Sequence, residues 1–99
     1  MTILHIVAWK LTSDDPTEKA EQAAQISARL GALVGVIDEI RSLRVGPDVV
    51  GGANWDVALV AEYDDEAALA RYQVHPAHVE AAGCVKSVTA ERMAVDFVS

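Results

Sequence analysis

The sequence predicts an α+β domain in which two helical regions cover one side of a four-stranded antiparallel sheet. Three observations lead to this prediction. The chain has 99 residues, which is the usual size of one domain. Its apolar residues make up 52% of the total, enough to build a core. Segments with strand-like and helix-like patterns follow one another in the order strand, helix, strand, strand, helix, strand.

Residues 3–11 favour a strand that is buried on both sides. Successive side chains of a strand point to opposite faces of the sheet, and here both faces are apolar. One face holds Ile3, His5, Val7, Trp9 and Leu11, and the other holds Leu4, Ile6 and Ala8. Two apolar faces are typical of a central strand.

A helix is predicted to begin after Asp15. Asp15 is a residue type that favours the N-cap, Pro16 suits the first helical position, and Glu18 lies three residues after the cap. Apolar residues then recur at helical spacing. We expect this helix to end near Gly35.

Two strands and a loop are predicted in the middle of the chain. Residues 40–46 and 55–63 carry apolar side chains at strand-like positions. The stretch 46–54 between them contains three glycines, which favours a loop. Both a lid over a cavity and a passive connector fit this composition.

A second helical region is predicted between the last two strands. Asp64 or Asp65 is expected to cap it, and Pro76 must interrupt it because proline lacks a backbone N–H and clashes with the preceding turn. Pro76 then begins a short further helix. Residues 88–97 form the fourth strand, with Met93 expected in the core.

This order of elements is the split βαββαβ arrangement of ferredoxin-like folds. Two helical regions cover only one face of the sheet, yet the strands at 3–11 and 55–63 are apolar on both faces. The uncovered face needs a partner, and a second copy of the chain can supply it. We therefore expect a homodimer whose sheets face each other.

The charge and cysteine content exclude several partners and sites. Eight Lys and Arg against fifteen Asp and Glu give a net charge of −7. Nucleic acid and anionic membranes are therefore not expected as partners. Cys84 is the only cysteine, so neither an intrachain disulfide nor a Cys-based zinc site is expected. No apolar run approaches the length of a membrane span and no signal-peptide pattern is present, so we expect a cytoplasmic protein.

Titratable and aromatic residues cluster between 72 and 78. Tyr72 and His75 are three residues apart, so they share a face if the helix reaches His75, and His78 lies one turn further on, past the break at Pro76. Histidine can act as acid or base at neutral pH, and a tyrosine can donate to a developing oxyanion. Together with His5, this cluster suggests cofactor-free enolisation or aldol chemistry.

Each of these residues also fits a purely structural role. His75 suits the cap of the helix that begins at Pro76, and His78 suits an ordinary surface position in its first turn. Tyr72 and His5 both suit the core. From pattern alone, the structural role is favoured for any one of them taken singly.

A metal site is the less favoured use of the histidines. His75, His78 and His5 could approach one metal ion, but no carboxylate shares their face. Asp56 and Asp96 lie on predicted strands and are expected to pair with Arg or Lys.

Four segments carry a resemblance to a known family. They are His-Ile-Val-Ala-Trp-Lys-Leu at 5–11, Ser-Leu-Arg-Val-Gly at 42–46, Tyr-Gln-Val-His-Pro-Ala-His at 72–78 and Val-Asp-Phe at 95–97. In these segments the chain resembles the stress-responsive A/B barrel (Dabb) family, as one domain of residues 1–99. The resemblance implies a dimeric α+β barrel, with an apolar cavity between the sheet and the helices of each protomer.

The resemblance also implies roles for particular residues. The segment at 75–78 is similar to that of the plant olivetolic acid cyclase, a family member that folds a polyketide by aldol condensation. By this resemblance His78 is the general base and Tyr72 holds a ketone or thioester oxygen. The residues expected to line the pocket are His5, Val7, Trp9 and His75. A divalent cation on backbone carbonyls is also implied, near Val34, Ile37 and Ile40.

Three functions fit these features. The first is an acid–base enzyme of aldol-cyclase or isomerase type, which acts without a cofactor on a carbonyl or polyketide-like compound. The second is a stress-linked dimer that binds a small apolar ligand without turnover. The third is a cofactor-free monooxygenase-like protein, or a haem protein with a histidine ligand, as in other dimeric barrels.

Overall fold

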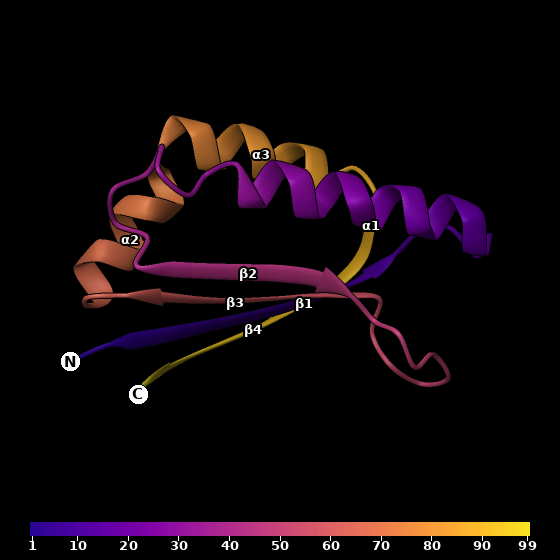
Figure 1. Ribbon diagram of the computed structural model, residues 1–99, viewed down its shortest axis with the longest axis horizontal. Helices are drawn as coiled ribbons and strands as arrows, with labels where there is room; N and C mark the ends of the chain where they lie inside the picture. Colours follow the sequence, from indigo (N-terminus) through magenta and orange to yellow (C-terminus); the bar gives the residue numbers. More distant parts are fainter.

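Three helices lie on one side of a four-stranded antiparallel sheet in the computed structural model, which describes residues 1–99 (Figure 1). The strands are β1 (Ile3–Leu11), β2 (Ser42–Pro47), β3 (Val57–Tyr63) and β4 (Thr89–Val98). The helices are α1 (Pro16–Gly31), α2 (Glu66–Val74) and α3 (Pro76–Lys86). The strand order β2-β3-β1-β4 confirms the predicted ferredoxin-like arrangement.

β1 lies in the middle of the sheet, as predicted. It pairs antiparallel with β3 on one side and with β4 on the other. Its odd-numbered residues, from Ile3 to Leu11, are buried beneath the helices, and its even-numbered residues face the opposite side of the sheet. Four of these residues belong to the core between the sheet and the helices, and His5 is the buried polar residue among them.

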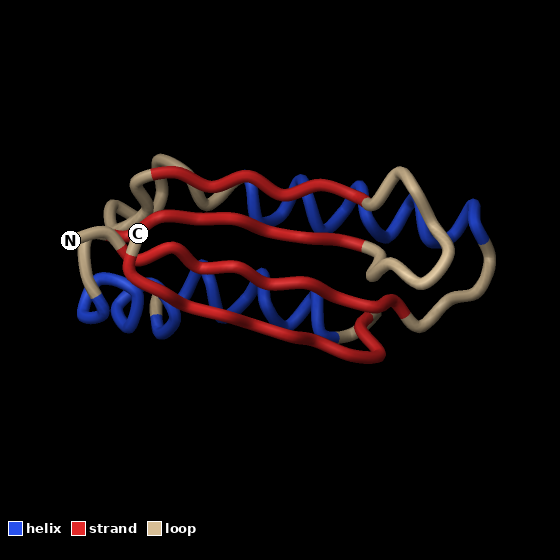
Figure 2. Tube along the Cα trace, turned by 90° about the horizontal axis from the view of Figure 1, so that it is seen from below, coloured by secondary structure: helices blue, strands red, loops and turns tan.

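The open face is the side of the sheet that the helices leave bare (Figure 2). The register of β1 with β3 and β4 shows which apolar residues lie on the open face. They are Leu4, Ile6, Ala8, Ala58, Val60, Met93, Val95 and Phe97. The prediction that Met93 lies in the core is wrong for the single protomer, because its position on β4 faces this side and leaves it 37% exposed. A sheet face of this composition is typical of a contact surface.

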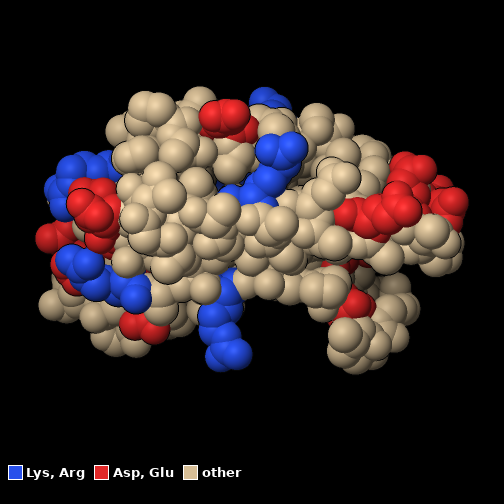
Figure 3. Space-filling view, turned by 45° about the horizontal axis from the view of Figure 1, so that its top comes forward, with Lys and Arg blue, Asp and Glu red and all other residues tan.

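Acidic side chains gather at one end of the molecule, whereas acidic and basic side chains are mixed at the other end (Figure 3). Acidic residues are exposed where α1 begins, among them Asp14, Asp15 and Glu18. None of the three helices combines the length and apolar character that a membrane crossing requires.

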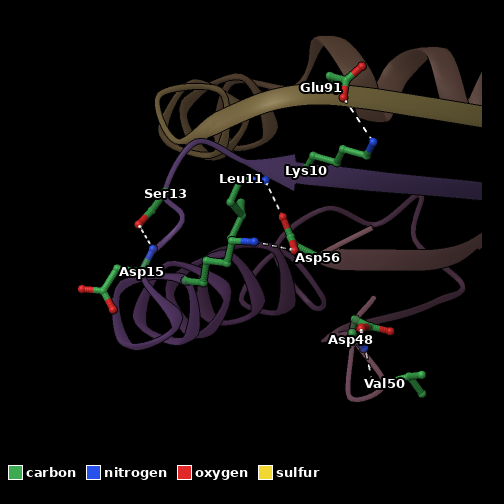
Figure 4. A network of polar contacts seen from close by, with 10 residues as sticks. Lys10, Leu11, Ser13, Asp15, Asp48, Val50, Asp56 and Glu91 are labelled. Atoms are coloured by element: carbon green, nitrogen blue, oxygen red, sulfur yellow. Dashed lines mark hydrogen bonds and ion pairs between the residues drawn. The ribbon is translucent and has the colours of Figure 1, made fainter. Parts of the chain in front are cut away.

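Asp56 ties the start of β3 to β1 and α1 (Figure 4). Its carboxylate accepts the backbone N–H of Leu11 at 2.8 Å and the ammonium of Lys19 at 3.3 Å. The predicted pairing of Asp56 with a basic residue is therefore confirmed. β3 itself begins at Val57, two residues later than predicted.

The predicted cap of α1 is confirmed, and the structure selects one of the two candidates for α2. The Asp15 carboxylate accepts the N–H of Thr17 at 2.9 Å, and Pro16 begins the helix. The Asp65 carboxylate accepts the N–H of Ala68 at 2.8 Å. Each cap satisfies a donor that has no partner inside its helix.

α1 is shorter than predicted. It ends at Gly31 rather than near Gly35, and turns continue to residue 39. Gly35 has a φ of +86°, a conformation that a residue with a side chain rarely adopts. Ile37 and Ile40 reach the core from these turns and not from a strand, so β2 begins two residues after the predicted start at 40.

The break at Pro76 divides the second helical region into α2 and α3. The backbone of His75 is extended, with a ψ of 133°, as expected for the residue before a proline. The helix after Pro76 has 11 residues, so it is longer than the short segment predicted. α3 consequently lies beside α1 above the sheet (Figure 1).

The loop between β2 and β3 extends beyond the sheet on the side away from the helices (Figure 1). Asp48 organises it, because its carboxylate accepts the N–H of Gly51 at 2.6 Å and the side-chain amide of Asn54 at 2.9 Å. Val49 and Val50 at its tip are exposed. The loop is thus held by its own hydrogen bonds while it presents apolar side chains to the outside.

Candidate functional site

A pocket of about 510 Å³ opens between α3 and the half of the sheet formed by β1 and β4. Its volume is in the range of sites for small organic molecules. The predicted site residues that line it are His5, Val7, Trp9, Tyr72 and His78. They come from β1, α2 and α3, so the fold brings together residues that lie more than 60 positions apart in the chain.

His5 lies in the wall formed by β1 and is only 4% exposed. The register of β1 with β4 sets it opposite Asp96, and its Nδ1 is hydrogen-bonded to the Asp96 carboxylate. Because a carboxylate accepts, Nδ1 carries the proton. The prediction that Asp96 pairs with Arg or Lys is wrong, since the pairing of β4 with β1 gives it an imidazole as neighbour instead.

Tyr72 and His78 lie against each other, with ring centres 4.4 Å apart. Tyr72 is buried, and this burial raises the pKa of its hydroxyl. The hydroxyl therefore keeps its proton at neutral pH. Tyr63 lies behind Tyr72, at 4.9 Å between ring centres, and burial raises the pKa of its hydroxyl too. Tyr72 therefore offers a neutral O–H donor next to the imidazole of His78.

His78 is half-buried in the first turn of α3. Its Nδ1 lies 3.0 Å from the backbone carbonyl of Gln73. A carbonyl can only accept, so Nδ1 is protonated and Nε2 keeps a free lone pair. Burial lowers the pKa of His78, which keeps the ring neutral at pH 7. The ring therefore has the protonation state of a general base.

His75 does not line this pocket. Its Nδ1 accepts the backbone N–H of Ala77 at 3.1 Å, so the ring caps α3. This is the structural role considered for it from sequence, and it corrects the expectation that His75 faces the ligand. The physical reason is the proline that follows, because it turns the backbone of His75 out of the helix.

Three polar residues near the pocket escaped the sequence reasoning. Asp96 was assigned to a different kind of partner, and Lys86 and Arg92, which both line the pocket, were not singled out. One signal was available: Arg92 and Asp96 are separated by an even number of residues on one strand, so they face the same side. Which side that is depends on the packing of the helices.

The structure contains no group of three or more His, Cys, Asp or Glu side chains that could hold a metal ion. The cation expected on backbone carbonyls concerns the turns after α1, at Val34, Ile37 and Ile40. The carbonyl of Ile37 accepts the N–H of Ile40 at 3.3 Å, so it already has one partner. The cation at these carbonyls stays a prediction.

Comparison with known proteins links the chain to one family. The family model described as the stress responsive A/B barrel domain (Dabb) matches residues 3–99. A dimeric protein of unknown function with a ferredoxin-like fold, from Bacteroides fragilis, is 31% identical with a TM-score of 0.91, over 99% of this chain and 96% of that chain. No curated protein sequence matches.

Two further solved structures have the same fold. A dimeric ferredoxin-like protein of unknown function from Thermobifida fusca is 30% identical, with a TM-score of 0.85, over 100% of this chain and 92% of that chain. A hydroxynitrile lyase from Passiflora edulis is 18% identical, with a TM-score of 0.80, over 99% of this chain and 93% of that chain. At 18% identity the likeness concerns the fold alone.

Proposed function

The chain belongs to the stress responsive A/B barrel domain (Dabb) family, and from this premise we propose that it is a cofactor-free acid–base enzyme. Its reaction class is proton transfer at a carbon next to a carbonyl, as in an isomerase or an aldol cyclase. The observation that carries the proposal is the contact of a neutral imidazole, His78, with a neutral phenol, Tyr72, at one pocket. The protein named hydroxynitrile lyase supports the view that this fold can carry an enzyme.

The proposed step uses one base and one hydrogen-bond donor. Nε2 of His78 takes the proton from the carbon next to the carbonyl, and the C–H electron pair becomes the double bond of an enolate. The Tyr72 hydroxyl donates to the oxygen, on which negative charge develops. The enolate carbon then either takes the proton back from His78 or attacks a second carbonyl carbon, whose oxygen takes that proton from His78. No electrons leave the substrate, so the step balances without an oxidant or a reductant.

His5 contributes a second imidazole to the same pocket. Asp96 holds its Nδ1–H, which leaves Nε2 as the nitrogen available to a ligand. A second polar nitrogen in a mostly apolar wall can fix the orientation of a substrate oxygen. We assign His5 this binding role and keep proton transfer for His78, because the phenol ring of Tyr72 lies against His78 at 4.4 Å between ring centres.

Exchange of protons for deuterium at the carbon next to a carbonyl tests the proposal without knowledge of the full reaction. Neutral ketones such as phenylacetone and cyclohexanone are incubated with the protein in D₂O, and loss of the proton signal is followed by NMR. The protein should exceed the buffer rate. His78→Gln should lose about 10²–10⁴-fold of that acceleration, and Tyr72→Phe about 10²–10³-fold. His75→Gln is the matched control, because its ring lies outside the pocket.

A protein that binds these ketones but never exceeds the buffer rate would support the second function, ligand binding without turnover. Binding is read independently from chemical-shift changes of the pocket residues. Full exchange activity in His78→Gln would show that another group is the base.

The open face supports a homodimer as the working form. Two relatives that are 30–31% identical are described as dimeric. Val95→Glu places a charge on the open face, next to Ile6 of the central strand, and should shift the protein to monomers in sedimentation velocity at micromolar concentration. Val79→Glu on α3 is the matched control, because Val79 is 56% exposed and Val95 49%. A dimeric Val95→Glu variant would contradict contact through this face.

A further inference from the structure

The eight basic residues of the chain fall into two sets. Four form ion pairs with carboxylates, and they are Lys10, Lys19, Arg41 and Arg71. The other four make no ion pair or side-chain hydrogen bond, and they are Arg29, Arg44, Lys86 and Arg92. Lys86 and Arg92 both line the pocket that holds His78 and Tyr72. Half of the unpaired positive charge of an acidic chain therefore lies at one pocket.

The one carboxylate at this pocket is already paired with a different basic residue. Glu91 is the only acidic residue that lines it. The carboxylate of Glu91 is paired with Lys10 at 3.4 Å, on the strand position that faces the open face. Asp96 is bonded to His5. An anionic ligand could therefore approach Lys86 and Arg92 without competing with an internal partner.

The unpaired basic residues lie at the opposite end of the pocket from the proposed acid–base residues. On β4, Arg92 precedes Asp96, the partner of His5, by four residues, which corresponds to about 13 Å along a strand. On α3, Lys86 follows His78 by eight residues, which corresponds to about 12 Å along a helix. The backbone spacing between the two sets of residues is therefore similar on the strand and on the helix.

We propose that this pocket binds an elongated organic anion, with a carboxylate on Arg92 and Lys86 and a carbonyl at Tyr72 and His78. The carbonyl end of this inference rests on the proposed function, and the anionic end adds the substrate class: an oxo acid whose two groups are separated by several carbons. A guanidinium binds a carboxylate through two parallel N–H···O bonds, and an ammonium adds a compact charge. The apolar side chain of Val7 lies between the two ends, and Trp9 is the strand partner of Arg92 at the basic end.

The charge of Arg92 also reaches the acid–base end. Burial is the main cause that lowers the pKa of His78, and the positive charge of Arg92 lowers that pKa further. A carboxylate bound to Arg92 would offset this effect and make Nε2 of His78 a stronger base. The carboxylate of the substrate would therefore favour removal of the proton from the carbon next to the carbonyl.

Two ligands that differ only in the charge of one end group measure the contribution of the carboxylate to binding. Binding of 6-oxoheptanoate and of its methyl ester is measured by calorimetry at low ionic strength, with the whole chain. The acid should bind about tenfold more tightly than the ester or better, because charge-assisted hydrogen bonds are stronger than neutral ones. Added salt should reduce this preference, since the basic groups are exposed.

Arg92→Gln should remove most of the preference for the acid, and Lys86→Gln should reduce it. Arg29→Gln is the matched control, because Arg29 is also exposed and unpaired but lies outside this pocket. Equal binding of acid and ester, no binding of the acid at millimolar concentration, or an unchanged preference in Arg92→Gln would each overturn the inference. A retained fold is checked by circular dichroism.

The two proposals fail separately. If the acid is preferred but the protein accelerates deuterium exchange in none of the ligands, the anion site stands and the enzymatic proposal fails. If neutral ketones exchange and the acid is not preferred, the anion site fails and the acid–base proposal stands.

Discussion

Replacement of Asp96 by alanine should destabilise the protein through His5. The substitution removes the only hydrogen-bond partner of an imidazole that is 4% exposed. A buried polar group without a partner costs about 1–3 kcal/mol. The Asp96 side chain is itself 39% exposed, so water can enter the space that it leaves, which favours the lower part of this range at about 1–2 kcal/mol. Each kcal/mol lowers the Tm of such a domain by about 4–8 °C, so a decrease of about 4–16 °C is expected.

A double-mutant cycle shows whether this cost belongs to the contact. Urea unfolding is measured for the unaltered protein, for Asp96→Ala, for His5→Phe and for the double variant. In the His5→Phe background, Asp96→Ala should cost almost nothing. Asp96→Asn should keep most of the stability, because its side-chain oxygen still accepts from Nδ1. All variants are compared at one protein concentration, since a dimer unfolds in a concentration-dependent way.

Equal losses from Asp96→Ala in both backgrounds would refute the reasoning. Such a result would mean that Asp96 acts through β4 or through the solvent, and that another group positions His5.

Three further predictions concern the site, the loop and a helix end. Burial lowers the pKa of His78 below its usual value near 6.5, so below that pH the unfolded chain binds more protons than the folded protein. The free energy of unfolding should therefore fall as the pH decreases from 6.5 towards the folded pKa, and His78→Gln should flatten this part of the curve from urea unfolding. Asp48→Ala removes an acceptor of the Gly51 amide, so hydrogen exchange at Gly51 should accelerate in NMR while the Tm of the domain changes little. Asp15→Ala removes the cap of α1 and should cost about 1 kcal/mol in thermal unfolding, whereas Asp14→Ala, next to it and without a capping bond, should cost little.

The order of the elements could be predicted from the sequence because local chemistry sets most of the boundaries. Asp15 and Asp65 cap helices through hydrogen bonds that span only two or three residues, and Pro76 acts on its immediate neighbours. The end of α1 is different. The apolar spacing continues past Gly31, and the change to turns depends on how Ile37 meets the core.

The same distinction between local and distant effects explains which site residues were found. Tyr72 and His78 lie six residues apart in one short segment, so the sequence alone associates them, whereas the break at Pro76 decides how their rings meet. The bond between His5 and Asp96 joins residues 91 positions apart, and it depends on β4 lying next to β1. Alternation also divides β4 into two faces but does not say which face the helices cover, and this is why Met93 was assigned to the core.

Because β1 lies between β3 and β4, the first of these four strands along the chain gains both neighbours only when the last of the four has been made. One of its two neighbours, β4, occupies ten of the last eleven residues, and the N–H of Ser99 bonds the carbonyl of Thr2 at 2.8 Å, so the two ends of the chain meet (Figure 1). Until β4 has been made, the edge of β1 that pairs with β4 has no partner. This edge can then pair with a wrong strand. A circular permutant, joined between residues 99 and 1 and opened in the loop between β2 and β3, would make β4 and β1 a local hairpin and should fold faster for that reason.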